Sequence, residues 1–87
     1  MRYLSRVEVR LKPGYLDPEG ESTGRALRDL GYRVSRVGVI KVYELELSAS
    51  SLEEARRLTE EMCRRLLSNP VKDDYSFEVR ELGKGRR

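Results

Sequence analysis

The sequence predicts one α+β domain with the element order β-α-β-β-α-β, in which a mostly antiparallel sheet carries two helices on one face. Three observations predict this fold. Residues 6–12 and 75–80 alternate between apolar and polar side chains, as strands with one face toward water do. Two other segments open with helix-capping residues and continue with apolar residues at helical spacing. Residues 34–47, between these segments, are rich in β-branched and aromatic side chains.

The length and charge of the chain bound its core and its partners. A chain of 87 residues fits one domain, which buries roughly 60–65% of its unfolded surface. The core must therefore be small, and a partner that covers leftover apolar faces would stabilise it. Lys and Arg (18) exceed Asp and Glu (15) by three charges, and Lys84, Arg86 and Arg87 account for them. We expect a near-neutral domain over residues 1–82, a basic, disordered tail over residues 83–87, and no nucleic-acid partner.

The first strand and the first helix are separated by a short turn. The alternating pattern of residues 6–12 predicts the strand, and Gly14 lies in the turn that ends it. Asp17 and Pro18 then supply a helix start, a capping carboxylate followed by proline at the first helical position. Gly31 ends the helix, because glycine accepts the left-handed conformation of a C-terminal cap. One apolar stripe is expected to face the sheet: Thr23, Ala26, Leu27 and Leu30.

The composition of residues 34–47 predicts β structure but does not decide between one strand and two. Five of its apolar residues share one parity and therefore one face: Val37, Val39, Tyr43, Leu45 and Leu47. Two strands and one long bent strand both fit this pattern. Ile40-Lys41 is poor chemistry for a tight hairpin turn, which usually requires Gly or Asn. We therefore favour a long, bent or bulged strand pair around residues 38–42.

The second helix has a clear start and a clear end. Ser51 and Glu54 form a capping box, in which each side chain is placed to bond the other residue's backbone N–H. Asn69 and Pro70 stop the helix, since a residue before proline is driven out of the helical region. The last strand follows over residues 75–80. The inner stripe of this helix is expected to contain Ala55, Leu58, Met62 and Leu66, together with Thr59 and Cys63.

This order of elements is that of the ferredoxin-like arrangement or a relative of it. Two helices can shield only one face of the sheet, so the other face must be polar or covered by a second chain. We expect dimerisation through that face or through the sheet edges.

The residues give little support to catalysis. The chain has no histidine, so the commonest general base and metal ligand is missing. Asp73 and Asp74 are neighbours that point apart, and Asp17 is better explained as a helix cap than as a metal ligand. Cys63 lies within a helix, which favours an inert packed thiol. One cysteine, no signal peptide and no apolar run long enough to cross a bilayer favour a cytoplasmic protein.

Several segments in order resemble the PurS family, a subunit of phosphoribosylformylglycinamidine (FGAM) synthase. Residues 11–20, LKPGYLDPEG, resemble the family's opening signature, in which a strand runs into a Leu-Asp-Pro-x-Gly segment. Lys41 with Glu44 resembles its central strand, residues 62–71 its second helix and exit, and residues 74–75 its closing Asp-Tyr. One departure lies just before Lys41: Gly38 and Ile40 stand where the family pattern has an arginine and a glycine.

The resemblance implies a PurS-like fold and a role without chemistry of its own. In the family, PurL binds ATP with magnesium and performs the ligation, PurQ releases ammonia from glutamine, and a PurS dimer joins the two and supports ammonia passage. The chain is thus expected to be a non-catalytic, required subunit of an ATP- and glutamine-dependent ligase in purine biosynthesis. No catalytic residue, cofactor or metal is expected on it, and it should form homodimers that can pair into tetramers.

Four residues match the family without a strong structural reason, and they are the candidates for subunit contacts: Lys12, Lys41, Glu44 and Asn69. The two lysines can also be solvated strand ends, and Asn69 can be only a helix stop. The alternative function is a small-ligand-binding regulatory domain of ferredoxin-like topology, with a ligand at the Pro13-Gly14 turn. The acidic residues that begin the following helix disfavour an anionic ligand there.

Overall fold

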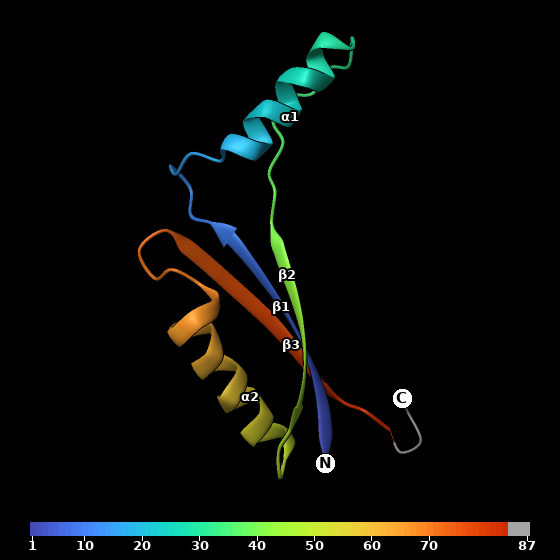
Figure 1. Ribbon diagram of the computed structural model, residues 1–87, viewed down its shortest axis with the longest axis vertical. Coiled ribbons are helices and arrows are strands. Elements are labelled where there is room, and N and C mark those ends of the chain that lie inside the picture. Colours follow the sequence, from blue (N-terminus) through green and yellow to red (C-terminus); the bar gives the residue numbers. More distant parts are fainter. Residues whose placement is uncertain (84–87) are drawn as a thin grey trace.

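A computed structural model describes residues 1–83 and contains a three-stranded antiparallel sheet of order β2-β1-β3 (Figure 1). In chain order its elements are β1 (Arg2–Leu11), α1 (Pro18–Asp29), β2 (Lys41–Ser48), α2 (Leu52–Met62), the π-helical turn η1 (Cys63–Leu67) and β3 (Asp73–Glu81). The α+β class and both predicted helices are confirmed. The predicted basic tail lies outside the described residues, apart from Gly83.

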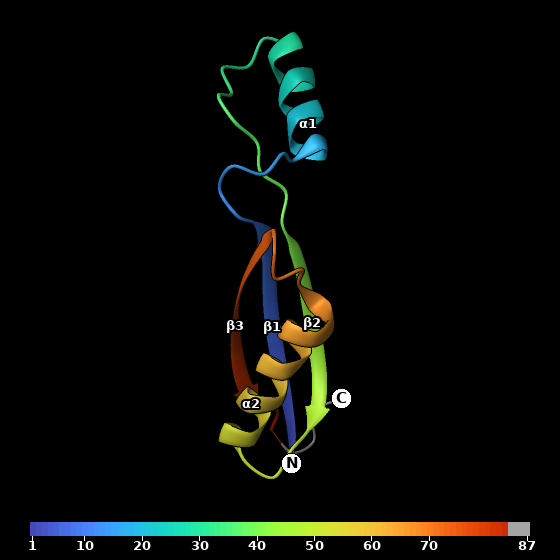
Figure 2. The ribbon, with the colours of Figure 1, turned by 90° about the vertical axis from the view of Figure 1, so that its left-hand side faces the viewer.

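The core lies on the face of the sheet that α2 covers (Figure 2). β1 is the central strand, and its odd-numbered residues from Tyr3 to Val9 are at most 5% exposed. α2 and η1 contribute Ala55, Thr59 and Cys63, all completely buried. The predicted alternation of the first and last strands is confirmed, because the odd-numbered residues of both strands point toward this core.

The predicted fourth strand is absent from the described residues, which is a correction to the expected β-α-β-β-α-β order. β2 begins at Lys41, opposite Val9, and the chain before it runs past the end of β1. Residues 33–40 therefore have no neighbouring strand with which to form a ladder, although they carry the β-branched residues that suggested one. The parity prediction holds within β2, whose Tyr43, Leu45 and Leu47 pack against the core.

α1 does not lie on the sheet, so the predicted second covering helix is also wrong for this chain taken alone. Figure 1 shows α1 and the returning segment beyond the end of the sheet. We call residues 13–40 the arm. Within it, α1 packs against the returning segment through Gly20 and Gly24, both buried, and a Cβ at Gly20 would collide with the carbonyl oxygen of Val37. Of the stripe expected to face the sheet, Leu27 is partly buried, whereas Thr23, Ala26 and Leu30 are exposed, Leu30 to 75%.

The end of the second helix departs from the expected spacing. Leu66, predicted on the inner stripe, is 83% exposed, and Leu67 packs against the core instead. The cause is η1: a π-helical turn holds more residues than an α-helical turn, so each residue is rotated less about the axis. In this turn Leu67 lies on the same face as the buried Cys63. With regular α-helical spacing, either Leu66 or Leu67 could occupy that face. The predicted stop is confirmed, since helical structure ends before Ser68.

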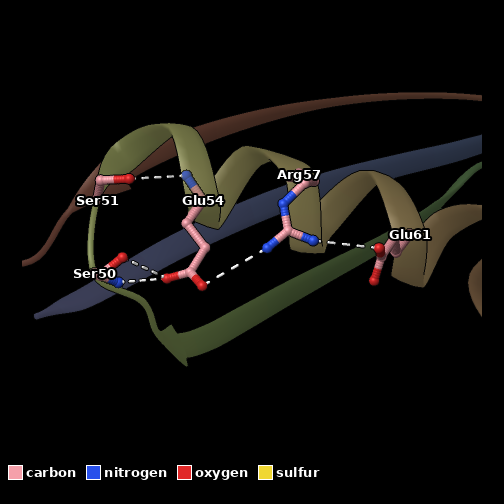
Figure 3. Close-up of polar contacts among 5 residues, drawn as sticks. All are labelled: Ser50, Ser51, Glu54, Arg57 and Glu61. Carbon is pink, nitrogen blue, oxygen red and sulfur yellow. Dashed lines mark hydrogen bonds and ion pairs between the residues drawn. The ribbon is translucent and has the colours of Figure 1, made fainter.

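The predicted capping box is confirmed in one half and altered in the other (Figure 3). Ser51 Oγ accepts a hydrogen bond from the Glu54 N–H at 3.0 Å. The Glu54 carboxylate instead accepts from the backbone N–H of Ser50 at 2.6 Å and from its hydroxyl at 2.9 Å. These two bonds, with a smaller contribution from Arg57, hold the pKa of Glu54 below its ordinary value. The cap thus spans one residue more than the motif predicts.

The face of the sheet opposite α2 is polar, which is one of the two outcomes expected for it. Leu4 and Val42 lie on this face among charged residues of both signs: Arg2, Arg6, Glu8, Arg10, Glu44, Glu46, Asp74, Glu78 and Arg80. Arg6 donates to Glu8 at 2.6 Å, and Arg6 also faces Glu44 on one side and Glu78 on the other. Since these charges neutralise one another locally, the face does not require an apolar cover.

A buried pair of hydroxyl groups ties α2 to the central strand and can be tested by a double-mutant cycle. Ser5 Oγ lies 2.6 Å from Thr59 Oγ1, which donates to the Ala55 carbonyl at 2.8 Å. Thr59→Val should lower the free energy of unfolding by about 1–3 kcal/mol, because it leaves the Ser5 hydroxyl buried without its partner. Ser5→Ala should cost less, and the double variant less than the sum of the two. Urea denaturation measures all three, and strictly additive costs would contradict the pairing.

Candidate functional site

Three of the four candidate contact residues lie at one end of the sheet. β1 runs antiparallel to both neighbours, so the end of β1 meets the beginnings of β2 and β3. Lys12 follows β1, Lys41 opens β2, and Asn69 lies in the loop before β3. We call this end, where the arm leaves the sheet, the junction. Glu44 lies apart from it, farther along β2 on the polar face, opposite Arg6.

The junction binds the start of the arm to the loop before β3. The Lys12 N–H donates to the Lys72 carbonyl at 2.8 Å, and Lys12 Nζ lies 2.7 Å from Asp74 Oδ1. The Tyr15 hydroxyl donates to the Val71 carbonyl at 3.2 Å. The two segments that carry most of the family resemblance, 56 residues apart at Tyr15 and Val71, are therefore in contact.

Asp17 is both a helix cap and a link across the arm. Asp17 Oδ1 accepts from the Gly20 N–H at 2.9 Å, which confirms the predicted cap, and Oδ2 accepts from the Val39 N–H at 2.9 Å. These two bonds, joined by the nearby positive charge of Arg36, hold the pKa of Asp17 below its usual range. One carboxylate thus joins the start of α1 to the segment that leads into β2. The sequence predicted only the first of these bonds.

Asn69 shapes the loop before β3. Its Oδ1 accepts from the Val71 N–H at 2.9 Å, an Asx-type turn, and its own N–H donates to Asp73 Oδ2 at 2.8 Å. Lys12 is engaged by Asp74, whereas Lys41 is exposed and forms no ion pair within residues 1–83. Lys41 is thus the candidate whose charge is most available to another molecule.

Sequence reasoning missed Tyr15 and Asp73 as parts of the junction. Tyr15 bonds the Val71 carbonyl 56 positions away, and Asp73 bonds the Asn69 N–H in the loop before β3, so no helical or strand periodicity marks either contact. The available signal was their position, because both lie in or beside the two segments that resemble the family.

A groove of about 790 Å³ runs along the junction between the end of β1 and the arm. The Pro13-Gly14 turn lines it, and Gly14 adopts a φ of 92°, which favours glycine. Asp17 and Arg36 contribute opposite charges to its wall. Arg10, Lys12 and Asp74 also line it, so charges of both signs surround the place where the alternative function would put a small ligand.

The two neighbouring aspartates, Asp73 and Asp74, do not converge on one point. Asp73 and Asp74 point apart, the first to the Asn69 N–H and the second to Lys12, as predicted. Within residues 1–83 there is no group of three His, Cys, Asp or Glu side chains placed to hold a metal ion. No helix in this part of the chain combines the length and the apolar character needed to cross a membrane.

Fold and junction together define a small α+β domain in which the polar residues of the junction form turns, a helix cap and links between segments. A family model described as PurS, phosphoribosylformylglycinamidine (FGAM) synthase, matches residues 4–81. The PurS subunit of Archaeoglobus fulgidus is 48% identical over 79 residues, covering 90% of this chain and 99% of that protein. The PurS subunit of Methanothermobacter thermautotrophicus is 40% identical over 82 residues, covering 94% and 98%.

Solved structures agree with the sequence comparisons. Thermus thermophilus PurS superposes with a TM-score of 0.84 at 39% identity, covering 95% of this chain and all of that one (100%). A chain of the PurLQS structure from Thermotoga maritima gives 0.80 at 34% identity, covering 94% and 99%. The chain therefore belongs to the PurS family, subunits of the FGAM synthase of purine biosynthesis.

The double role of Asp17 gives the arm a predictable response to acid. The lowered pKa means that its bonds to the Gly20 and Val39 N–H groups stabilise the fold above the unfolded-state pKa of about 3.9. That contribution should disappear as the pH falls through the lower, folded-state pKa. In an NMR titration, the amide resonances of Gly20 and Val39 should shift with a midpoint below that of an ordinary aspartate.

Two variants control this titration. Asp17→Asn should abolish the shift at both amides, whereas Glu19→Gln, an exposed first-turn residue, should leave it unchanged. A midpoint at or above the ordinary aspartate value would contradict the bonds described for Asp17.

The chemistry of Cys63 can be tested by its accessibility to thiol reagents. Its side chain is completely buried, and burial, with the negative charge of Glu60 nearby, raises the pKa of the thiol. At neutral pH the reactive thiolate should therefore be scarce and shielded. An aromatic disulfide reagent should label the native chain far more slowly than the chain in denaturant. Equal labelling rates in the two conditions would show that Cys63 is not an inert packed thiol.

Proposed function

We propose that this chain is a non-catalytic accessory subunit of FGAM synthase that joins PurL to PurQ as a homodimer and supports ammonia transfer between them. The observation that carries the proposal is the match, over 94% of this chain, to a chain of a PurLQS structure. That complex unites a PurL, a PurQ and a PurS component, and this chain has the length and fold of the third.

The shape of the chain supports a role in assembly. Its radius of gyration is 16.9 Å, whereas a compact domain of this length has about 12 Å. Its accessible surface is 6712 Å², and a monomer of 10.1 kDa is expected to have about 5,300 Å². A chain that leaves this much surface open is stabilised by partners, because association covers what its own folding does not.

The side chains of this chain support the proposal that catalysis takes place on the other two subunits. With no histidine in the sequence and a packed thiol at Cys63, the chain offers no nucleophile with an activating base. Under the proposal ATP and magnesium bind to PurL, and glutamine is hydrolysed on PurQ. The contribution of this chain is then to hold the two in register, in the cytoplasm, where all three subunits meet their substrates.

The junction is the proposed contact region on this subunit. Lys41 supplies an unengaged charge and lines a hollow together with Lys72 and Asp73, next to the loop that Asn69 shapes. Lys12 is paired with Asp74 at the same end of the sheet. Glu44 provides a second contact on the polar face, where with Arg6, Glu78 and Arg80 it lines a hollow of about 260 Å³.

Reconstitution with PurL and PurQ from the same source tests the proposal. Glutamine-dependent synthase activity should require all three chains, which should also co-elute. With a high concentration of ammonium salt in place of glutamine, PurL should depend much less on this chain, because dissolved ammonia replaces transferred ammonia. Full glutamine-dependent activity without this chain, or an equal requirement for it with ammonium, would contradict the bridging role.

A charge reversal at the junction tests the contact region. Lys41→Glu should weaken co-elution with PurL or PurQ by about tenfold or more, since it opposes the charge complementarity of the contact. Arg56→Glu is the matched control, an exposed cation on α2 far from the junction, and it should have little effect. If the two reversals are equally harmful or equally harmless, the contact does not lie at the junction.

A further inference from the structure

A groove of about 640 Å³ runs along the arm, between α1 and the returning segment of residues 33–40. We call it the arm groove. Gly20 and Gly24, both buried, line it where the helix and that segment touch. Tyr15 and Leu16 line it as well and are 47% and 65% exposed. The groove therefore offers apolar contact surface at the end where the arm leaves the sheet.

Three arginines give the arm groove its cationic side chains. Arg25 and Arg28 come from α1, and Arg36 comes from the returning segment. None of the three forms an ion pair with an Asp or Glu within residues 1–83. Arg28 donates to the Val34 carbonyl at 2.9 Å, which holds the guanidinium in place and leaves its charge unneutralised. These charges are therefore available to an anionic group of another molecule.

Two carboxylates, Asp17 and Glu21, also line the arm groove. Both oxygens of Asp17 already accept hydrogen bonds from backbone N–H groups, and its negative charge is partly offset by Arg36. Both acids lie toward the start of α1, where they complement the helix dipole. The positive charge of the groove therefore prevails farther along the helix, at Arg25 and Arg28.

The arm groove opens on the flank of α1 that does not carry the apolar stripe. An α-helix turns by about 100° per residue. Arg25 and Arg28 therefore lie nearly opposite to Leu30, the residue of the stripe that is 75% exposed. A molecule that covers the stripe leaves the arm groove accessible, so the two surfaces can serve different partners.

The arm groove is continuous with the groove at the junction. Gly14, Tyr15, Asp17 and Arg36 line both of them. The two grooves form one concave track that leads from the end of β1 along the flank of α1. The junction is the proposed contact region for the other synthase subunits, and this track extends that region onto the arm.

The arginines are distributed along the arm groove and are not gathered at one point. Arg36 lies near Asp17, at the base of the arm, whereas Arg28 is held at Val34, toward its tip. A small ion needs donors that converge on it. An extended chain can instead present successive carboxylates to cations at intervals, which is how arginine clusters recognise acidic motifs.

We propose that the arm groove binds an extended, acidic segment of PurL or PurQ. Its carboxylates pair with Arg25, Arg28 and Arg36, since the planar guanidinium matches a carboxylate with two parallel hydrogen bonds. An apolar side chain of the same segment packs on Tyr15 and Leu16. Tyrosine and arginine are the residue types that contribute most to protein interfaces. The proposal rests on the proposed function and gives the assembled synthase a second contact on this subunit.

A charge reversal in the arm groove tests the contact by affinity. Arg25→Glu should raise the dissociation constant of this chain from PurL and PurQ about tenfold or more, because it places like charges together. Arg33→Glu is the matched control, the same change at an exposed residue of the same arm that does not line the groove. Sedimentation velocity measures both constants. Equal effects of the two reversals would overturn the proposal.

The structure of the variant can be checked independently of its binding. Arg25 is exposed, so Arg25→Glu should keep the circular dichroism spectrum of the natural chain. The amide resonances of Gly20 and Val39 should also stay in place, because the Asp17 bonds that they report lie at the base of the arm.

Photo-crosslinking in the assembled synthase identifies the occupant of the arm groove. Ser35 lines the groove and is exposed, so Ser35→p-benzoylphenylalanine should cross-link to one segment of PurL or PurQ that is rich in Asp and Glu. Replacing the cross-linked acid by lysine should restore the affinity of Arg25→Glu. Cross-links confined to copies of this chain, or to a segment without acidic residues, would overturn the proposal.

A titration with inorganic phosphate distinguishes a small anion from a polypeptide. Millimolar phosphate should leave the amide resonance of Ser35 where the same concentration of chloride leaves it. A saturable shift that Arg28→Gln abolishes, without any cross-link to PurL or PurQ, would make the groove a phosphate site and overturn the proposal.

The outcomes separate this inference from the proposed function. If Arg25→Glu assembles as the natural chain does and synthase activity with glutamine still requires this chain, the contact in the arm groove is wrong and the bridging role stands. Failure of the bridging role would instead appear as glutamine-dependent activity that does not need this chain at all.

Discussion

The length of β1 is the constraint on which the rest of the structure depends. Within residues 1–83, β1 is the only strand with two neighbours, and it spans 10 residues, ending at Leu11. Both β2 and β3 begin opposite its last residues, so the ladder and the core end there together. Whatever lies beyond this point must be stabilised by local contacts or by another molecule. That is the position of the arm.

The junction stabilises the base of the arm, and it does so through polar rather than apolar contacts. Asp17, Tyr15 and Lys12 each reach a segment distant in the sequence, and together they connect the arm, the end of β1 and the loop before β3. These bonds lie near solvent, where each contributes modestly to stability. Their effect is chiefly to set the direction in which the arm leaves the sheet.

The sequence predicted the parts of this fold that local rules determine. Asp17, Gly31 and Ser51 mark their helix ends because capping depends on a few neighbouring residues, and the parity of the strands depends only on the pleat. The candidate residues Lys12, Lys41 and Asn69 came from family resemblance, and the fold brings them to one end of the sheet. Glu44 does not join them, because it lies farther along β2.

What could not be predicted depends on distant partners. Residues 33–40 have strand composition, but a ladder needs a neighbour, and β1 ends too early to supply one. The apolar stripe that includes Leu30 predicts that one face of α1 packs against another surface. It does not identify that surface. Leu66 and Leu67 were both compatible with the core until η1 selected the second. In each case the local sequence is compatible with two structures, and contacts with residues distant in the sequence decide which one forms.

The central claim is that this chain acts by position, delivering nitrogen from PurQ to PurL without performing chemistry. An isotope partition measures this most directly: the complete complex is supplied with glutamine labelled with ¹⁵N in its amide group, in the presence of unlabelled ammonium. The account predicts that the nitrogen added to the product remains ¹⁵N even when bulk ammonium is abundant. Dilution of the label in proportion to the bulk ammonium would contradict it.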